Sequence, residues 1–253
     1  MTNKLKYFIA NWKMFGHFGS IKIIYQIQLL YKKFRLHKRK NKIIFCVPST
    51  LISHFSKMLK SKSIIIGAQN CAHYENYGPF TGSISAAMLR NVGAKYIILG
   101  HSENRSAGDT NSSIQKKIKL ALDQKLNIIF CIGETLKEKN KNKTFAVIEN
   151  QIKGSLQKKY NLNKIIFAYE PIWSIGTGKV PKIKELDEIF IFIKKKIKTL
   201  FKTKKSPIVL YGGSVNDKNI RMFSSIPEID GFLIGGASQS SKKFIDIIKN
   251  YYK

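Results

Sequence analysis

The sequence predicts an α/β fold, a single closed (β/α)8 barrel that takes up residues 1–253. Two patterns indicate it: short apolar, β-branched runs recur eight times, and amphipathic helical patterns lie between them. The length of 253 residues suits one barrel of this kind. No composition shift and no long linker rich in Pro, Gly or Ser divides the chain, so we expect one domain.

The apolar runs are continuous rather than alternating, which is typical of strands buried on both faces of a parallel sheet. The predicted strands are Tyr7–Ala10, Ile43–Val47, Ile64–Ala68, Tyr96–Leu99, Ile128–Ile132, Ile165–Ala168, Ile208–Leu210 and Gly231–Ile234.

Apolar residues at i, i+3, i+4 and i+7 predict the helices between these strands. The longest stripe runs from Leu186 to Leu200, and we expect Lys194, Lys195 and Lys196 to point mostly outward from it. The two other stripes consist of Ile114, Ile118, Ala121 and Leu122, and of Ile24, Ile27, Tyr31 and Phe34.

A doubly wound open sheet is the competing fold. It would usually need a glycine-rich turn after the first strand, and Asn11-Trp12-Lys13 stands there instead. The lysine-rich run Lys137–Lys143 is interpreted as the solvated start of a helix.

The net charge of +30 raises the question of nucleic-acid binding. The lysines are spread along the whole chain rather than gathered into one tail, so we expect no specific nucleic-acid partner. A positive field could still speed the capture of an anionic substrate.

The cysteines and the apolar runs bear on the cellular compartment. Cys46, Cys71 and Cys131 form no CxxC pair and are odd in number, so neither a disulfide framework nor a zinc site is predicted. No run approaches the ~20 apolar residues of a membrane helix, and Tyr7–Ala10 is too short for a signal peptide. We expect a cytoplasmic protein with no membrane partner.

Polar residues and glycines follow most of the predicted strands, and in a barrel these strand ends meet on one face. Glu170 comes directly after the sixth strand, and the loop Pro171–Lys179 behind it contains two glycines, which suits a lid over a site. The other strand ends carry Asn11 and Lys13, His101-Ser102-Glu103, Cys131-Ile132-Gly133-Glu134, Tyr211-Gly212-Gly213-Ser214 and Gly235-Gly236.

This set of side chains suits proton transfer next to a carbonyl group. Glu170 is placed to act as the base, His101 can polarise the carbonyl, and Lys13 and Asn11 can add a positive charge and a donor. The glycine-rich ends of the last two strands present backbone N–H groups that suit a phosphate.

Each of these residues also has a structural interpretation. His101 could be a hydrogen-bonded structural residue, Glu170 half of an ion pair, and Gly212-Gly213 only a tight turn. Glu134 is predicted to be structural, and Glu103 could orient Lys13. The remaining histidines, which we expect at the surface, are His17, His37, His54 and His73.

Taken together and in order, these motifs resemble triosephosphate isomerase, a family known for tuned acid–base chemistry and lid closure. The matching segments are Phe8–Met14, Gly67–Asn70, Gly100–Glu103, Cys131–Glu134, Ala168–Lys179, Tyr211–Val215 and Gly235-Gly236.

The resemblance implies a TIM barrel and an isomerase that interconverts dihydroxyacetone phosphate and D-glyceraldehyde 3-phosphate in glycolysis and gluconeogenesis. It implies Glu170 as the base, His101 as a neutral electrophile, and Lys13 and Asn11 as catalytic, substrate-contacting residues. It implies no cofactor and no metal. The phosphate would be held by backbone N–H groups of Gly176, Ser214, Gly235 and Gly236.

The resemblance also implies a lid over residues 171–181, latched by Tyr211 and Ser214 when closed. It further implies a homodimer, in which the segment 72–81 inserts beside the active site of the partner and places Thr81 near the partner's first-strand residues.

Five positions depart from the family pattern. Phe15 replaces a common Asn, and Ser174 replaces a common Ala in the lid. Ser83 and Asn104 stand where a Glu and an Arg commonly pair across the dimer interface. Pro181 lies at the far hinge of the lid, where it fixes φ. We expect these changes to affect dimer strength and lid kinetics, and not the reaction.

Two other functions compete with the isomerase. A nucleic-acid- or membrane-surface-binding barrel would use the positive charge but would not need Lys13, His101 and Glu170 in this arrangement. Another phosphate-binding barrel enzyme is compatible with the fold, and the Glu170 loop together with the Asn11/Lys13 pair argues against it.

Overall fold

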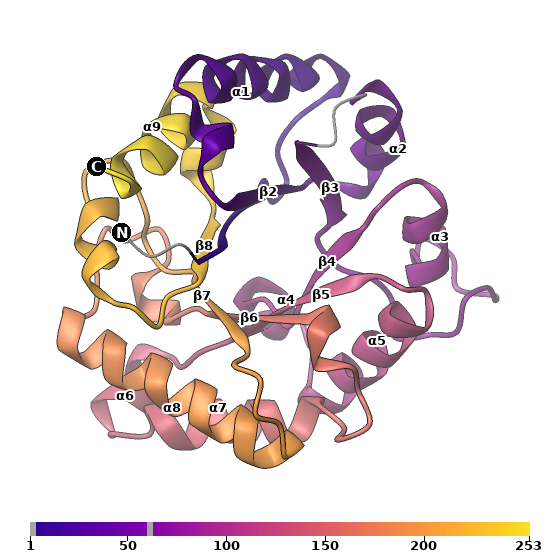
Figure 1. The fold of residues 1–253 in the computed structure, drawn as a ribbon. Coiled ribbons are helices and arrows are strands. Elements are labelled where there is room, and N and C mark those ends of the chain that lie inside the picture. Colours follow the sequence, from indigo (N-terminus) through magenta and orange to yellow (C-terminus); the bar gives the residue numbers. More distant parts are fainter. Residues whose placement is uncertain (1–3, 60–62) are drawn as a thin grey trace.

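Eight parallel strands form a closed barrel in the computed structural model, which describes residues 4–59 and 63–253 (Figure 1). Each strand pairs with the next along the chain, and β1 pairs with β8. The strands are β1 (Lys6–Asn11), β2 (Asn41–Cys46), β3 (Ile64–Ala68), β4 (Tyr96–Leu99), β5 (Asn127–Ile132), β6 (Ile165–Tyr169), β7 (Ile208–Tyr211) and β8 (Gly231–Ile234).

The closed sheet confirms the predicted fold class and excludes the doubly wound alternative. The predicted ranges of β3, β4 and β8 agree with the structure, and the other strands differ by one or two residues at an end. Asn11 therefore lies in the last position of β1 rather than after it.

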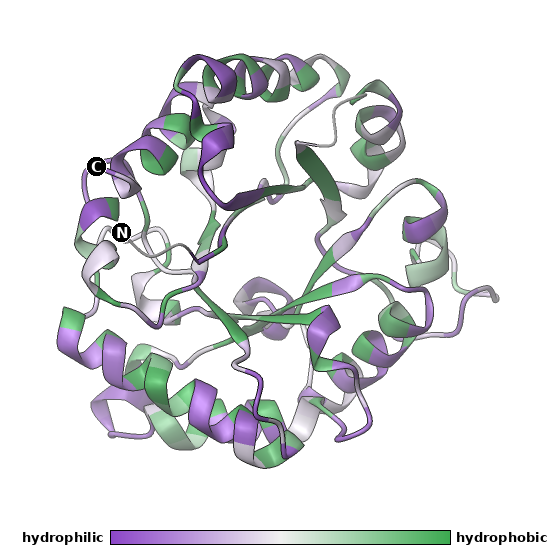
Figure 2. Ribbon diagram, viewed as in Figure 1, coloured by the Kyte–Doolittle hydropathy of each residue, from purple (hydrophilic) through white to green (hydrophobic). Residues whose placement is uncertain are grey.

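Helices surround the barrel (Figure 1). Their buried apolar residues pack against the strands, and most of their other residues are polar (Figure 2). They are α1 (Ile21–Lys33), α2 (Ser49–Met58), α3 (Ala86–Asn91), α4 (Ser102–Ser106), α5 (Asn111–Asp123), α6 (Leu136–Asn140), α7 (Thr144–Ser155), α8 (Ile183–Phe201) and α9 (Ser241–Tyr251), with the short 3-10 turns η1 (Phe18–Ser20), η2 (Leu36–Lys38), η3 (Leu162–Lys164), η4 (Ile172–Ser174), η5 (Ile220–Ser225) and η6 (Gly236–Gln239).

The core has two parts because successive strand residues point to opposite faces. Phe8 and Ala10 of β1 belong to the larger cluster between sheet and helices, whereas Tyr7 and Ile9 belong to the smaller cluster that fills the barrel. The barrel interior is thus packed with side chains.

Lys194 of α8 contradicts the expectation that it points outward. Its side chain is buried, and its Nζ lies 2.9 Å from both Glu228 Oε2 and Asp230 Oδ2. The apolar stripe of α8 includes the i+8 position, which Lys194 occupies relative to Leu186, so the helix period places it on the inner face.

Two further expectations were wrong in detail. The run Lys137–Lys143 does not start one helix: α6 ends at Asn140, and Lys143 directly precedes α7. Phe34 lies just past α1 and is exposed rather than part of a buried stripe. Over residues 4–59 and 63–253, no helix is long and apolar enough to cross a membrane.

Candidate active site

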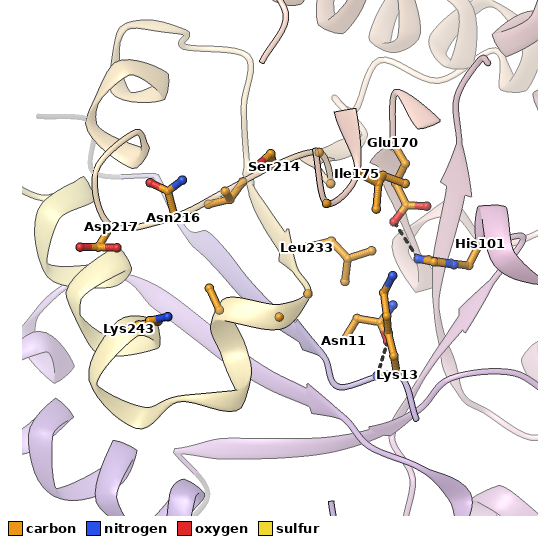
Figure 3. A pocket seen from close by; sticks show the side chains of 17 residues that line it. Asn11, Lys13, His101, Glu170, Ile175, Ser214, Asn216, Asp217, Leu233 and Lys243 are labelled. Carbon is orange, nitrogen blue, oxygen red and sulfur yellow. Dashed lines mark hydrogen bonds and ion pairs between the residues drawn. The ribbon is translucent and has the colours of Figure 1, made fainter. Parts of the chain in front are cut away.

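The carboxyl ends of the strands surround a cavity of about 350 Å³ (Figure 3). Every site residue that the sequence suggested lies on its wall. These residues are Asn11, Lys13, His101, Glu170, Gly176, Ser214, Gly235 and Gly236. The barrel thus brings together residues that are up to 225 positions apart along the chain, from Asn11 to Gly236.

Glu170 is buried at the end of β6, where its backbone N–H donates to Ile132 O over 2.8 Å. Its Oε1 lies 3.6 Å from His101 Nε2, and its Oε2 has no hydrogen-bond partner within the described part of the chain. Burial raises the pKa of this carboxyl group, and His101 and the Cys131 thiol only partly offset that effect. A carboxylate that is buried and free to accept a proton is suited to act as a general base.

Two glycines give the Glu170 side chain and backbone their space. A Cβ on Gly212 would lie 2.6 Å from Glu170 Cγ, and one on Gly133 would lie 1.9 Å from Glu170 O. Neither glycine has a positive φ. The Gly212 position is therefore set by the approach of Glu170, and not by a turn that requires left-handed backbone.

His101 caps the first turn of α4, and this contact selects the tautomer of its neutral ring. Its Nδ1 accepts the Glu103 backbone N–H at 3.2 Å, so Nδ1 carries a lone pair and not a proton. The neutral ring then carries its proton on Nε2, the atom that faces Glu170. His101 can donate a hydrogen bond to a substrate oxygen without carrying a charge.

Lys13 holds a strained backbone conformation at the end of β1, with φ at +55°. Four other non-glycine residues in the described ranges share a positive φ, and each lies at or just after the end of a helix: Arg35, Lys125, Asn142 and Lys202. Only Lys13 carries this strain at the cavity. Such strain costs on the order of 1–3 kcal/mol and persists where neighbouring groups hold it.

Those neighbouring groups are two amides and a carboxylate. Asn11 Oδ1 accepts the Lys13 N–H at 3.2 Å, and both Lys13 O and Cys46 O accept from Gln69 Nε2 at 2.9 Å. Lys13 Nζ pairs with Glu103 Oε1 at 2.5 Å, as the structural interpretation of Glu103 suggested. The Lys13 ammonium is therefore held at the cavity.

The glycine-rich loops after β7 and β8 also line the cavity (Figure 3). Gly235 O accepts from both the backbone N–H and the hydroxyl of Ser238, and Ser238 O accepts from Trp12 Nε1 at 3.1 Å. A Cβ on Gly235 would come within 3.9 Å of Lys13 Cε, and one on Gly236 would have no described heavy atom within 4 Å. These hydrogen bonds hold the loop in place, its two glycines carry no side chains, and it lies next to a positive charge, which suits an anion.

The lid begins with η4 (Ile172–Ser174) and is anchored through Glu134. Trp173 Nε1 donates to Glu134 Oε1 at 2.9 Å, and the Tyr169 hydroxyl donates to both oxygens of that carboxylate at 3.1 and 3.2 Å. Glu134 is thus structural. Gly176 and Gly178 have φ values of +70° and +77°, and the lid tip between them is exposed.

Ser174 connects the lid to the loop after β7. Its Oγ lies 3.2 Å from Tyr211 OH, accepts the Ser214 N–H at 3.2 Å, and donates to Lys179 O at 2.5 Å. Tyr211 and Ser214, the residues that the resemblance implies as a latch, therefore contact the lid through this one hydroxyl group.

Sequence reasoning missed three polar residues that also line the cavity: Asn216, Asp217 and Lys243 (Figure 3). Lys243 lies at the start of α9 in a chain with many lysines, so no sequence signal distinguished it. No group of three or more His, Cys, Asp or Glu residues in the described ranges could hold a metal ion. His17 and His37 are exposed, and His54 and His73 are half-buried.

Comparisons with known proteins show the family of the chain. The family model of triosephosphate isomerase matches residues 6–251. The chain is 40% identical to the triosephosphate isomerase of Dictyoglomus thermophilum, with 97% of this chain and 99% of that protein covered. It is 38% identical to that of Bartonella tribocorum, with 98% and 97% covered.

A solved structure is similar as well. The crystal structure of triosephosphate isomerase from Bartonella henselae superposes with a TM-score of 0.88 at 34% identity, covering 98% of this chain and 99% of that one. The family match over nearly the whole chain, the relatives and the barrel all agree: the chain belongs to the triosephosphate isomerase family.

Proposed function

We propose that this protein interconverts dihydroxyacetone phosphate and D-glyceraldehyde 3-phosphate, a step of glycolysis and gluconeogenesis, with Glu170, His101, Lys13 and Asn11 as its catalytic residues. The observation that carries the assignment is the pairing of a buried carboxylate with an imidazole in the cavity. Glu170 Oε1 and His101 Nε2 face each other over 3.6 Å, so both can reach neighbouring carbons of one small substrate.

The reaction follows from these two groups. The Glu170 carboxylate removes the proton from C1 of dihydroxyacetone phosphate, and the C–H electron pair forms the C1–C2 double bond of an enediolate. Negative charge develops on the C2 oxygen, where the His101 Nε2–H donates. His101 gives its Nε2 proton to the C2 oxygen and takes the proton of the C1 hydroxyl group in its place. Glu170 then returns its proton to C2 as C1 becomes the aldehyde, so the proton balance closes without a cofactor.

Lys13 and the backbone N–H groups have electrostatic roles. The Lys13 ammonium, held by Glu103, stabilises the developing oxyanion and the bound dianion, and Asn11 keeps the Lys13 backbone in place. The N–H groups of Gly176, Ser214, Gly235 and Gly236 bind the phosphate group. This binding positions the two reacting carbons between Glu170 and His101.

The proposal extends to the assembly: one domain over residues 1–253, two copies per active unit, in the cytoplasm. The segment between β3 and α3 projects from the barrel (Figure 1). Tyr77 in this segment and Met14 near the cavity are strongly exposed, and the Tyr74 and Phe80 rings stack at 3.9 Å. Exposed aromatic residues on a preformed loop suit insertion into a partner.

The test is a coupled assay on purified protein. Glyceraldehyde 3-phosphate is supplied, and dihydroxyacetone phosphate is followed through a dehydrogenase that oxidises NADH. Glu170→Gln removes the base and keeps the shape, so we expect fast turnover in the wild type and near-zero turnover in the variant. A folded wild-type protein without turnover would contradict the function, and a fully active variant would contradict the role of Glu170.

A further inference from the structure

Ser174 is a fully buried serine at the first hinge of the lid, and its hydroxyl group has three partners. A hydroxyl group can donate one hydrogen bond and accept two. The Lys179 carbonyl can only accept and the Ser214 N–H can only donate, so Ser174 donates to the first and accepts from the second. The Tyr211 hydroxyl must then donate to Ser174, and the hydrogen-bonding capacity of Ser174 is full.

The packing around this junction leaves no room for a further group. A Cβ on Gly213 would lie 2.2 Å from Tyr211 OH and 2.8 Å from Ser174 Oγ. The three hydrogen bonds therefore form without competition from water. They tie the two ends of the lid to each other, through Lys179, and to the loop after β7.

One of these bonds uses a group that the substrate also needs. The Ser214 N–H lies on the wall of the cavity and is among the groups proposed to bind the phosphate, yet in this structure it donates to Ser174. A phosphate dianion is a stronger acceptor than a hydroxyl oxygen. Phosphate binding and the Ser174–Ser214 hydrogen bond therefore compete for the same hydrogen atom.

We propose that Ser174 is a positioning residue that occupies the Ser214 N–H in the substrate-free protein and is displaced by the phosphate group of the substrate. Displacement removes one of the two hydrogen bonds that hold the first lid hinge to β7 and its loop, the other being the bond from Tyr211, while the Ser174–Lys179 bond keeps the lid in one piece. The inference rests on the proposed function for the identity of the substrate, and it assigns the trigger of lid movement to the phosphate end.

The experiment measures the binding of inorganic phosphate, which needs no turnover. In Ser174→Ala the Ser214 N–H has no competitor, so we expect the dissociation constant of phosphate to fall about 2- to 10-fold, the worth of one ordinary hydrogen bond. Hydrogen exchange at the Ser214 amide, followed by NMR without phosphate, is expected to become faster in the variant.

Thr177→Val is the matched control. The Thr177 hydroxyl also stiffens the lid. It donates to Trp173 O at 3.1 Å and to the backbone Ser174 O at 3.2 Å and accepts the Lys179 N–H at 3.2 Å, and no hydrogen bond joins it to Ser214 or to the Ser174 hydroxyl. We expect this variant to bind phosphate no more tightly than the wild type. An equal gain in both variants would assign the effect to a looser lid and overturn the proposal.

Unchanged or weaker phosphate binding in Ser174→Ala, or no phosphate binding by the wild type, would overturn the proposal as well. The coupled assay separates this outcome from the fate of the proposed function. Turnover without the Ser174→Ala gain removes only the inference about Ser174. Tighter phosphate binding in Ser174→Ala without turnover in the wild type would support the role of Ser174 and contradict the proposed isomerase activity.

Discussion

Glu170 is held in the fold at a cost in stability. Its side chain is buried, and one of its oxygens has no hydrogen-bond partner in the described ranges. Burial raises its pKa, which means that the folded chain binds the proton more tightly than the unfolded chain does. Ionisation above the ordinary glutamate pKa therefore weakens the fold, and the site keeps a base at the expense of stability.

The first prediction is that Glu170→Gln stabilises the protein at pH 7 while it abolishes turnover. Replacing the carboxylate by a neutral amide removes the desolvation penalty of the ionised group, which is about 1–3 kcal/mol. Urea unfolding followed by circular dichroism measures this change. The gain should shrink as the pH falls toward 4, where the wild-type carboxyl group is also neutral. Equal stability of the two proteins at pH 7 would contradict it.

The second prediction concerns the titration of Glu170 itself. We expect its carboxyl carbon to titrate with a midpoint above 4.5, the ordinary value. Carbon-13 NMR of glutamate-labelled protein without substrate measures this midpoint, and the signal lost in Glu170→Gln assigns it. A midpoint at or below 4.5 would mean that His101 and Lys13 outweigh burial.

The sequence placed the residues of the site but not their contacts. Glu170, His101 and Lys13 could be singled out because they follow predicted strands, and parallel strand ends converge. The positive φ of Lys13 and the three contacts of Ser174 could not be predicted, because they depend on loops that meet only in the folded chain. No local sequence pattern predicts contacts between such distant segments.

At the scale of elements, the buried ion pairs of Lys194 fix α8 to the loop before β8. Its Nζ contacts both Glu228 and Asp230, and Asp230 Oδ2 also accepts the Val209 N–H at 2.9 Å. The helical period could place Lys194 on the inner face of α8, but the carboxylates come from a loop more than thirty residues away. Sequence alone therefore favoured the outward orientation that lysine usually takes.

The third prediction is that Lys194→Ala destabilises the fold by about 1–3 kcal/mol, because Glu228 and the buried Asp230 lose this partner while Lys4 still pairs with Asp230. Lys195 is the neighbouring control: it is exposed, and Lys195→Ala should change stability by less than about 0.5 kcal/mol. Urea unfolding of the two variants measures the difference. Similar values for both would show that the pair contributes nothing to stability.

At the scale of the whole molecule, the net charge of +30 is large and the lysines lie on many elements. The eight strands could be predicted from the sequence, because a barrel core needs buried apolar runs that alternate with helices. The effect of the surface charge on substrate capture could not be predicted, because it depends on the salt concentration of the solution. A field of this sign around the site should guide an anionic substrate toward it.

The fourth prediction is that kcat/KM for glyceraldehyde 3-phosphate falls severalfold as ionic strength rises from 10 to 150 mM, while kcat changes little. The screening length drops from about 30 Å to about 8 Å over this range, so capture of the substrate slows and the enclosed chemistry does not. Steady-state assays in a salt series measure it. A constant kcat/KM would show that the charge has no role in capture.

The fifth prediction is that the proposed dimer is weaker than is usual for the family. Ser83 and Asn104 stand where a charged pair is common, and Asn104 Oδ1 instead accepts from Asn70 Nδ2 at 3.2 Å within the chain. Because both charged residues are absent, no buried charge is left unpaired at the interface. We therefore expect the dimer to be weakened but not abolished. Analytical ultracentrifugation over a dilution series should show that the dimer dissociates at protein concentrations above the nanomolar range. A dimer that persists throughout the series would contradict it.

Gln69 directly follows β3, and its side-chain NH2 group joins this strand end to two others. It donates to Lys13 O, after β1, and to Cys46 O, at the end of β2. These contacts involve no part of the lid. The part of the site that contains Lys13 is therefore formed when the barrel folds, before any substrate binds. With Ser174 acting as proposed, the half that carries the lid is the one that responds to the substrate, so substitutions at Ser174 can change the pace of lid opening and leave the chemistry unchanged.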